Sequence, residues 1–277
     1  MNILSWNIQA TKGCDGVYNS QRIIDEIKQC EQLDVICLQE LSRFFPDMGN
    51  IDQLSVLQEA FPDYEAVWSA AISWRQNGRH RKEFGNLTLV KQPLLEDYHL
   101  HTLPWPPAQG LWQMPRTAIE TLIRVDRGFL RIINTHLAYH NPVERQLQLG
   151  YLSALNQRAI ARSLSTNAID TFGCYAPAPS TNTTILCGDL NLASDSGEYR
   201  DFISTADWVD CWQHLNCSND ARTPTCGCFD HQQWPQGPHC RDYFFITCGF
   251  EHCLKSMHIN TQTDASDHQP IMLRIDI

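Results

Sequence analysis

Long hydrophobic runs are missing from this sequence. Hydrophobic residues make up 43% of the 277 residues, yet no uninterrupted apolar stretch approaches the ~18 residues of a transmembrane helix. The chain starts MNILSWN, without the basic segment, apolar run and small-residue cleavage site of a secretory signal. We therefore expect no membrane insertion and a cytoplasmic location.

Positive charge is also scarce. Lys and Arg number 21 against 31 Asp and Glu, which gives a formal net charge of −10. This balance disfavours a general electrostatic hold on nucleic acid or on an anionic membrane. One basic cluster stands out, at Arg75, Arg79, His80, Arg81 and Lys82. It is either a solvated hairpin loop or a local phosphate-facing surface.

Repeats, linkers, low-complexity tracts and phosphate-binding glycine patterns are absent as well. The length allows a sizeable core without staples. Apolar runs alternate with helical patterns along the whole chain, which favours strands that face each other with helices outside. We expect one domain over residues 1–277.

Cysteine, by contrast, is abundant, with 12 residues. Cys37, Cys187 and several others sit inside apolar runs, so we interpret most of them as reduced core thiols rather than as a disulfide framework. Residues 226–240 allow a second interpretation, a structural zinc site. Its C-x-C spacing is tighter than the usual C-x₂₋₄-C pairs, which disfavours that alternative. Its candidate ligands are Cys226, Cys228, His231, His239 and Cys240.

Periodicity predicts most of the regular elements. Helices are expected over 20–33, 51–61, 142–164 and 198–207, and loops over 101–110, 165–182 and 216–240. Strands are expected over 3–8, 34–39, 64–73, 84–90, 117–125, 128–137, 183–191, 242–247, 252–259 and 268–275.

Two groups of side chains in these segments have structural and functional interpretations. Trp105, Trp112 and Trp234 lie in loops, where they could stack on a base, although packing onto the core is favoured. Glu144, Arg145 and Gln148 lie near the start of the longest helix and are expected on its solvated face.

Polar residues recur where apolar strands begin or end. Each alone has an ordinary explanation, such as a turn, a cap or a solvent-facing charge. Their recurrence along the chain instead predicts that the strand ends converge on one site. The set comprises Asn7, Glu40, His136, Asp189, Asn191, Asp242, Asp267 and His268.

This mixture of side chains has a chemical interpretation. Carboxylates with amide oxygens suit a hard cation such as Mg²⁺ or Mn²⁺. Histidines beside carboxylates can perform acid–base chemistry or donate hydrogen bonds to a phosphate. Together they suit metal-assisted attack of water on phosphorus.

Six short motifs resemble those of the endonuclease/exonuclease/phosphatase superfamily, in the same order. They are SWNIQ (5–9), LQE (38–40), NTHL (134–137), GDLNL (188–192), RDYFF (241–245) and SDHQP (266–270). The resemblance spans residues 3–275. It implies an α+β fold, a four-layer αββα sandwich with two facing, mostly antiparallel sheets and outer helices.

The resemblance also implies roles for metal-side and phosphate-side residues. Glu40 would be the principal Mg²⁺ ligand, with Asp267 near the metal. Asn7 would help to hold the metal-bound water or the phosphate. Arg116 resembles an arginine before a strand that touches phosphate in some members.

The catalytic residues follow in the same way. Asp189 would position or deprotonate the attacking water, and Asn191 would orient it. His268 would contact the scissile phosphate, oriented by Asp242, and His136 would be a second phosphate-side imidazole. The general base is either Asp189 or a histidine.

Two departures from relatives shape this interpretation. Gln9 stands where abasic-site endonucleases carry an Asp, which moves the chain away from that branch. No clear glutamate partner for His136 is evident, and Glu120 is the one candidate.

We therefore predict a metal-dependent phosphodiester hydrolase of nuclease type that uses in-line attack of water. Its substrate is a phosphodiester, with nucleic acid among the candidates, and we expect a monomer. The alternatives are a phosphomonoesterase, a phosphoesterase for lipid or inositol headgroups, and a non-catalytic binding protein.

Overall fold

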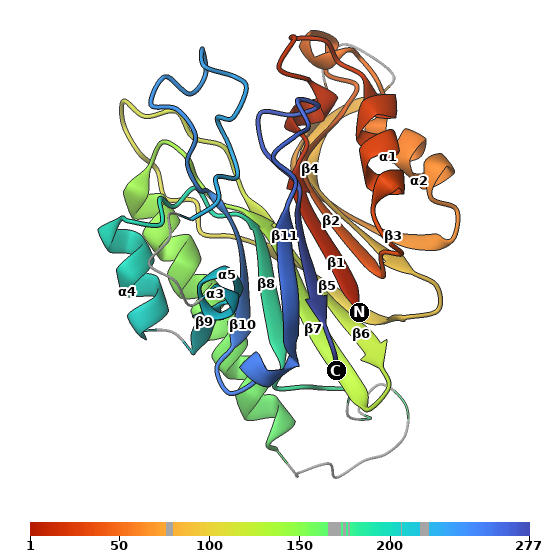
Figure 1. The fold of residues 1–277 in the computed structure, drawn as a ribbon, viewed down its shortest axis with the longest axis vertical. Coiled ribbons are helices and arrows are strands. Elements are labelled where there is room, and N and C mark those ends of the chain that lie inside the picture. The colour runs from red at the N-terminus through yellow and green to blue at the C-terminus, as the bar shows by residue number, and fades with distance from the viewer. Residues whose placement is uncertain (76–79, 166–172, 174–175, 177, 206, 217–221) are drawn as a thin grey trace.

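The protein is built on two six-stranded sheets that lie face to face between helices (Figure 1). The structure is a computed structural model that describes residues 1–75, 80–165, 173, 176, 178–205, 207–216 and 222–277. The first sheet has the order β11-β12-β1-β2-β4-β3, and the second has the order β5-β6-β7-β8-β10-β9.

The strands of the first sheet are β1 (Asn2–Asn7), β2 (Val35–Arg43), β3 (Tyr64–Arg75), β4 (Arg81–Lys91), β11 (Leu254–Ile259) and β12 (Ile271–Ile275). Those of the second are β5 (Leu95–Thr102), β6 (Thr117–Val125), β7 (Gly128–His136), β8 (Thr184–Asp189), β9 (Trp208–Asp210) and β10 (Asp242–Thr247). One pair in each sheet is parallel, β1 with β2 and β7 with β8, and the other pairs are antiparallel.

Three apolar layers hold the sandwich together. Between the sheets, Ile3 and Val35 of the first sheet share a buried cluster with Ile132, Ile185 and Phe244 of the second. A second cluster joins the first sheet to α1 (Ser20–Gln29) and α2 (Gln53–Ala60), and a third joins the second sheet to α3 (Pro142–Ser163) and α4 (Gly197–Thr205). The expected four-layer αββα sandwich is confirmed.

Local sequence explains where the helices begin and which face they bury. Asn19 accepts a hydrogen bond from the Gln21 amide at the start of α1, and the helix then buries Ile23 and Ile27. Asn141 caps α3 in the same way, with Pro142 at the first helical position. None of the described helices is long and apolar enough to span a membrane.

Periodicity missed the elements whose burial is slight or whose length is short. β5 was not predicted because its sequence LEDYHLHT is polar and lies at the edge of its sheet. β9 and α5 (Cys211–Leu215) span only a few residues each and were also missed. Most of the predicted 165–182 loop, and Arg79 of the basic cluster, lie outside the described residues.

Strand register brings the predicted site residues to one end of the sandwich. Asn7 pairs with Gln39 across the parallel strands β1 and β2. His136 pairs with Asp189 across β7 and β8, and Asp189 also pairs with Asp242 across β8 and β10. Polar side chains from both sheets therefore lie at the same edge, as the strand-end pattern predicts.

Two backbone features adjust this edge. A bulge in β2 between Leu38 and Leu41 contains Glu40, whose φ of 60° re-aims its side chain relative to a regular strand. Gly188 has φ 130°, and a Cβ there would lie 1.9 Å from the Thr135 carbonyl oxygen. Only glycine allows β8 to approach β7 so closely immediately before Asp189.

Glycine substitutions should separate this requirement from glycine loss in general. We expect Gly188→Ala to destabilise the protein, because the methyl group must push β8 away from β7. Gly150 lies in α3 with nothing within 4 Å of its would-be Cβ. Gly150→Ala should therefore stabilise the protein by about 0.5–1 kcal/mol. Urea unfolding followed by circular dichroism measures both, and equal stability of Gly188→Ala and wild type would contradict this account.

Candidate active site

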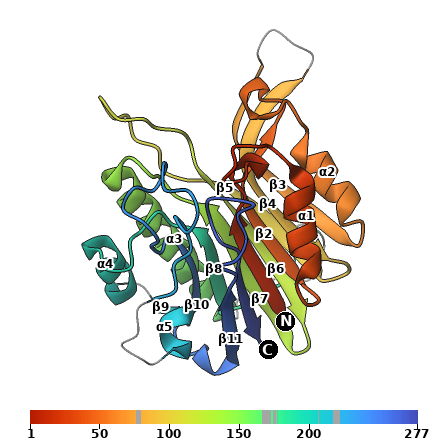
Figure 2. The same cartoon turned by 45° about the horizontal axis from the view of Figure 1, so that its top comes forward.

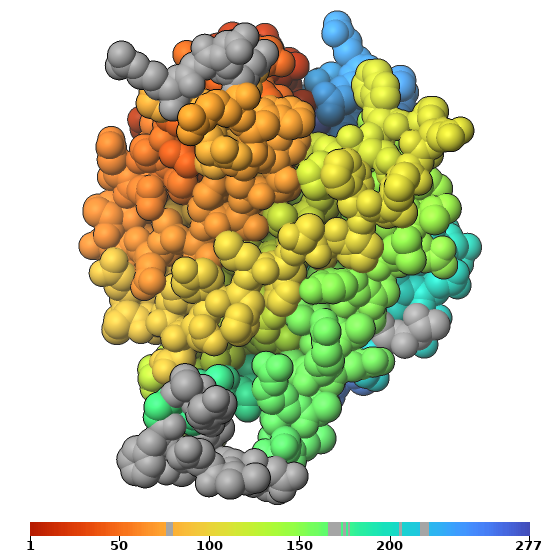
Figure 3. Space-filling model, turned by 180° about the vertical axis from the view of Figure 1, so that it is seen from behind, coloured from red at the N-terminus to blue at the C-terminus, as the bar shows by residue number. Residues whose placement is uncertain are grey.

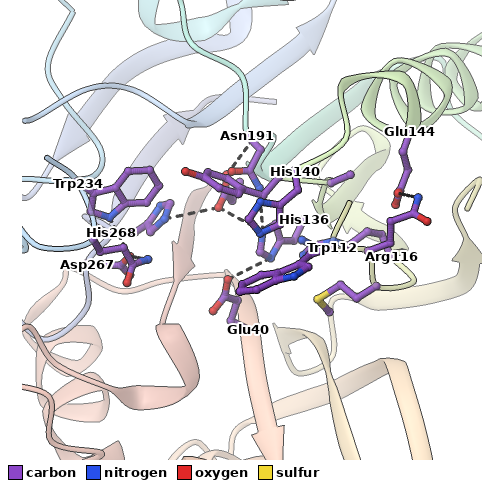
Figure 4. Close-up of a pocket in the computed structure, with 16 residues that line it drawn as sticks. Glu40, Trp112, Arg116, His136, His140, Glu144, Asn191, Trp234, Asp267 and His268 are labelled. Carbon is purple, nitrogen blue, oxygen red and sulfur yellow. Dashed lines mark hydrogen bonds and ion pairs between the residues drawn. The ribbon is translucent and has the colours of Figure 1, made fainter. Parts of the chain in front are cut away.

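A cavity of about 590 Å³ opens at this edge of the sandwich. Figure 4 shows the side chains that line it, which come from both sheets and from the loops that follow them. Seven predicted site residues lie in the lining: Glu40, Arg116, His136, Asp189, Asn191, Asp267 and His268. The other two, Asn7 and Asp242, form hydrogen bonds with Glu40 and His268 of the lining.

Asp189 is the centre of this arrangement. Its Oδ1 accepts a hydrogen bond from the backbone N–H of Asn191 at 2.9 Å, and its Oδ2 accepts one from Asn7 Nδ2 at 3.1 Å. The Nε2 atoms of His136 and His268 lie 3.4 Å and 3.6 Å from Oδ2. Burial opposes ionisation, but the charge of His268 and these hydrogen bonds outweigh it and lower the pKa of Asp189. The carboxylate is therefore ionised and able to accept a proton.

His268 is held as a cation. Its Nδ1 lies 2.9 Å from Asp242 Oδ2, which also accepts from Thr225 Oγ1 at 2.6 Å. Burial opposes protonation, but the carboxylates of Asp242, Asp189 and Asp267 raise the His268 pKa well above its ordinary value. An imidazolium with Nε2 near Asp189 can donate a hydrogen bond to a bound anion.

His136, in contrast to His268, is neutral. Asn191 Nδ2 lies 3.0 Å from His136 Nε2 and also donates to the Leu137 carbonyl, so Nε2 is the acceptor of this pair. Burial and the nearby Arg116 lower the His136 pKa to about 3, which keeps the ring neutral. The prediction that Glu120 is the glutamate partner of His136 is wrong, because Glu120 forms ion pairs with His101 and Arg131 instead.

The Glu40 and Asp267 carboxylates, which are the expected metal ligands, both line the cavity. Burial, followed by the Asp267 charge, raises the Glu40 pKa to about 7. Asp267 Oδ2 accepts from Gln233 Nε2 at 2.7 Å and from Trp234 Nε1 at 3.0 Å. A cation between two carboxylates would relieve their repulsion, and hard oxygen ligands suit Mg²⁺ or Mn²⁺. Asn7 turns Nδ2 toward Glu40 Oε1, at 3.2 Å.

The cluster of Asp189, Asp242 and His268 is a second place in the site where a cation could be considered, but it suits a cation less well than Glu40 and Asp267 do. Asp189, Asp242 and His268 have ligand atoms within 4.8 Å of one another, and among the described residues theirs is the cluster with metal-ligand spacing. The His268 imidazolium already supplies positive charge there. Cys226, Cys228 and Cys240, all described, are not brought into any such cluster, and Cys226 Sγ instead lies 3.3 Å from His239 Nε2. The zinc alternative therefore has no structural support.

Arg116 places a further positive charge in the cavity wall. Its residue is 8% exposed, and its guanidinium forms no hydrogen bond or ion pair within the described part of the chain. The nearby charges of Glu40, Asp189 and Glu144 favour its cationic form against burial. A buried, uncommitted guanidinium is suited to bidentate binding of a phosphate.

Several residues near the site differ in burial from the expectation of a solvated helix face or of packing onto the core. Trp234 is buried and holds Asp267, whereas Trp105 and Trp112 are exposed rather than packed onto the core. Glu144, Arg145 and Gln148 were expected on the solvated face of α3, and all three are buried. Arg145 donates to the carbonyls of Ala138 and Tyr139, which follow β7.

Beneath the cavity, sequence reasoning also missed a polar bridge between the sheets. Gln39 Nε2 donates to Asn134 Oδ1 at 2.8 Å, and Asn134 Nδ2 donates to the Leu87 carbonyl at 3.0 Å. Both side chains are fully buried. Their signal in the sequence was a polar residue inside an otherwise apolar strand, two residues before His136 and one before Glu40.

The metal assignment predicts ligand-dependent stabilisation. We expect Mg²⁺ or Mn²⁺ to raise the melting temperature of the wild type, since a ligand at 100 times its Kd stabilises the folded state by about 2.7 kcal/mol. Glu40→Gln should lose this response while melting no lower than the wild type without metal, because it removes a buried carboxylate. The exposed Glu65→Gln is the matched control. An unchanged metal response in Glu40→Gln would rule out Glu40 as a ligand.

Comparisons with known proteins agree with this geometry. A model of the Endonuclease/Exonuclease/phosphatase family matches residues 4–268. No curated protein matches the sequence.

Solved structures are similar over almost the whole chain. An endonuclease/exonuclease/phosphatase from Beutenbergia cavernae has 21% identity and a TM-score of 0.69, over 99% of this chain and 71% of that one. A mannosyl-6-phosphatase from Bacteroides thetaiotaomicron has 17% identity and a TM-score of 0.70, over 100% of both chains. D. rerio TDP2, solved with a single-strand DNA product, has 17% identity and a TM-score of 0.64, over 100% of this chain and 99% of that one. At these identities the likeness shows the shared fold.

Proposed function

We propose that this chain, which belongs to the Endonuclease/Exonuclease/phosphatase family of hydrolytic phosphoesterases, cleaves a phosphodiester with the help of Mg²⁺ or Mn²⁺. The observation that carries the proposal is the juxtaposition of one ionised Asp189 with two positive groups, His268 and Arg116, in one cavity. Such a site provides a proton acceptor for water beside a place for an anion.

Each group has a distinct part in the proposed reaction. The phosphate binds against Arg116 and the His268 imidazolium, which hydrogen-bond to its oxygens. Asp189 accepts the proton of the attacking water. Asn7 and Asn191 donate hydrogen bonds to the two carboxylate oxygens of Asp189 and so hold them in place. As the water oxygen bonds to phosphorus, the P–O bond to the leaving group breaks, and the leaving oxygen takes up the proton of the His268 imidazolium. Neutral His136 lies 3.4 Å from the Asp189 carboxylate.

Glu40 and Asp267 are the residues that would hold the cation. When bound, Mg²⁺ or Mn²⁺ would offset the negative charge that builds up on the phosphate oxygens. Asn7 donates to Glu40, so it orients this ligand and Asp189 together. His268 remains oriented by Asp242 throughout.

Two observations bear on the substrate and the location. The TDP2 structure holds a single-strand DNA product, which supports a nuclease-type diester, whereas the mannosyl-6-phosphatase supports a phosphomonoester as the second candidate. The ten described cysteines are free thiols, which supports a reducing, cytosolic environment.

Hydrolysis of bis-p-nitrophenyl phosphate tests the reaction. We expect turnover with Mg²⁺ or Mn²⁺ that EDTA abolishes. Asp189→Ala should lower kcat by at least about 100-fold because it removes the proton acceptor, and His268→Ala should do so because it removes a charge on the anion. Absorbance at 405 nm follows product release, and circular dichroism checks the fold.

The controls separate the two candidate substrates. The remote variant Glu65→Gln should keep full activity. Faster turnover of p-nitrophenyl phosphate than of the diester would favour the phosphomonoesterase, and full activity of Asp189→Ala or His268→Ala would refute the site assignment.

A further inference from the structure

The mouth of the cavity has a different character from its base. Trp112 and His140 line the cavity together with the catalytic groups, although they lie outside the set that the reaction uses. Figure 4 labels both residues among the side chains that line the cavity. Trp112 is 82% exposed, and Trp105, in the same segment, is 53% exposed.

A series of aromatic rings connects this mouth to the catalytic centre. Trp112 and His140 have ring centroids 5.6 Å apart, and His140 lies 4.7 Å from Tyr139. Tyr139 is 6.0 Å from Trp234, which is 5.8 Å from His268. Trp234 and His268 at the inner end are buried, whereas Tyr139, His140 and Trp112 toward the mouth are exposed, and Trp112 is the most exposed tryptophan of the series.

The segment that carries Trp112 is tied to α3. We call residues 103–116, between β5 and β6, the arm. Gln113 Nε2 donates to the Pro106 carbonyl at 3.0 Å and to Glu144 Oε2 at 2.7 Å. Gln148 Nε2 donates to the Pro104 carbonyl at 3.1 Å. Figure 2 shows the arm, in yellow, projecting from the site end, and Figure 3 shows it from behind at the same end as the blue loop after α5.

These hydrogen bonds matter for binding. Because they fix the arm around Trp112, less conformational freedom is lost when a ligand covers this part of the chain. The Trp112 ring offers a large apolar face with few rotatable bonds. The arm therefore presents an open aromatic face beside the proposed phosphate site.

Charge limits what can occupy this space. Among the described residues, Arg116 is the one Lys or Arg that lines the cavity. A protein that follows a duplex needs several cationic contacts to successive phosphates, which this lining does not offer. Stacking, by contrast, needs a planar ring and tolerates any base. The 590 Å³ cavity is in the range of about 300–1,000 Å³ that small ligands occupy.

We infer that Trp112, supported by His140, is a stacking platform for one nucleobase, so that the substrate is a nucleotide diester or the end of a single strand rather than a duplex. This inference rests on the proposed function only for the position of the phosphate. It assigns to the arm a role in specificity that the catalytic residues do not explain.

Binding without turnover tests the platform. The Asp189→Ala background prevents hydrolysis, and titration calorimetry with Mg²⁺ present measures two probes, thymidine 5′-monophosphate and 2-deoxyribose 5-phosphate, which differ by the base. We expect the nucleotide to bind more tightly than the sugar phosphate. Trp112→Ala should weaken nucleotide binding about 5- to 150-fold, since stacking on one base contributes about 1–3 kcal/mol.

The same experiment has matched controls. Trp112→Ala should leave binding of 2-deoxyribose 5-phosphate within about two-fold, and Trp112→Phe should restore most of the nucleotide affinity because it keeps a flat ring. Trp105→Ala removes an exposed tryptophan from the same arm that does not line the cavity, and it should leave both affinities unchanged.

Three results would overturn the inference. They are equal affinity for the two probes, equal weakening of both by Trp112→Ala, and a loss of nucleotide affinity in Trp105→Ala as large as that in Trp112→Ala. Failure of the proposed function would show itself separately, as no metal-dependent hydrolysis of bis-p-nitrophenyl phosphate while nucleotide binding still depends on Trp112.

Discussion

The hydrogen bond between Gln39 and Asn134 joins the two sheets at the depth where the site begins. Both side chains are completely buried, and Asn134 also donates to the Leu87 carbonyl of the first sheet. An unpaired polar group in such a place costs about 1–3 kcal/mol, so a packing of the sheets that broke this hydrogen bond would be less stable. Because Glu40 follows Gln39 and His136 lies two residues beyond Asn134, this bridge sets the carboxylate of one sheet against the imidazole of the other.

In the site above this bridge, two histidines have different charges because their neighbours differ. His268 faces three carboxylates and is cationic, whereas His136 lies near Arg116, accepts from Asn191 and is neutral. Two identical side chains therefore carry different charges beside one carboxylate. In the proposed reaction, the cationic one offers an anion a positive partner in a protein with a net charge of −10. The attraction is local to the cavity rather than a property of the whole surface.

The arm adds an exposed aromatic surface to the charged groups of the cavity. Burial of Glu144 and Gln148 on α3, which the helical pattern did not indicate, provides partners for the arm's own polar groups. Those hydrogen bonds tie the arm to α3, and Trp112 of the arm is exposed and lines the cavity. The proposed catalytic groups lie at strand termini, and the proposed stacking surface lies on a loop that a helix supports. This division is common in enzymes, because loops vary while strands keep the chemistry in place.

Much of this protein follows from local sequence. Alternating and helical apolar patterns predicted most strands and the long helix, and polar residues at strand ends identified the groups that meet in the cavity. Such features are readable because burial of one face imposes a period of 2 or 3.6 on the residues themselves. The tertiary structure decided the rest. The Gln39–Asn134 bridge spans 95 residues, the re-aimed Glu40 depends on a bulge against β4, and the charge of each histidine depends on neighbours from other strands. Contacts between distant segments leave no period in the chain, because the partner's position exists only after folding.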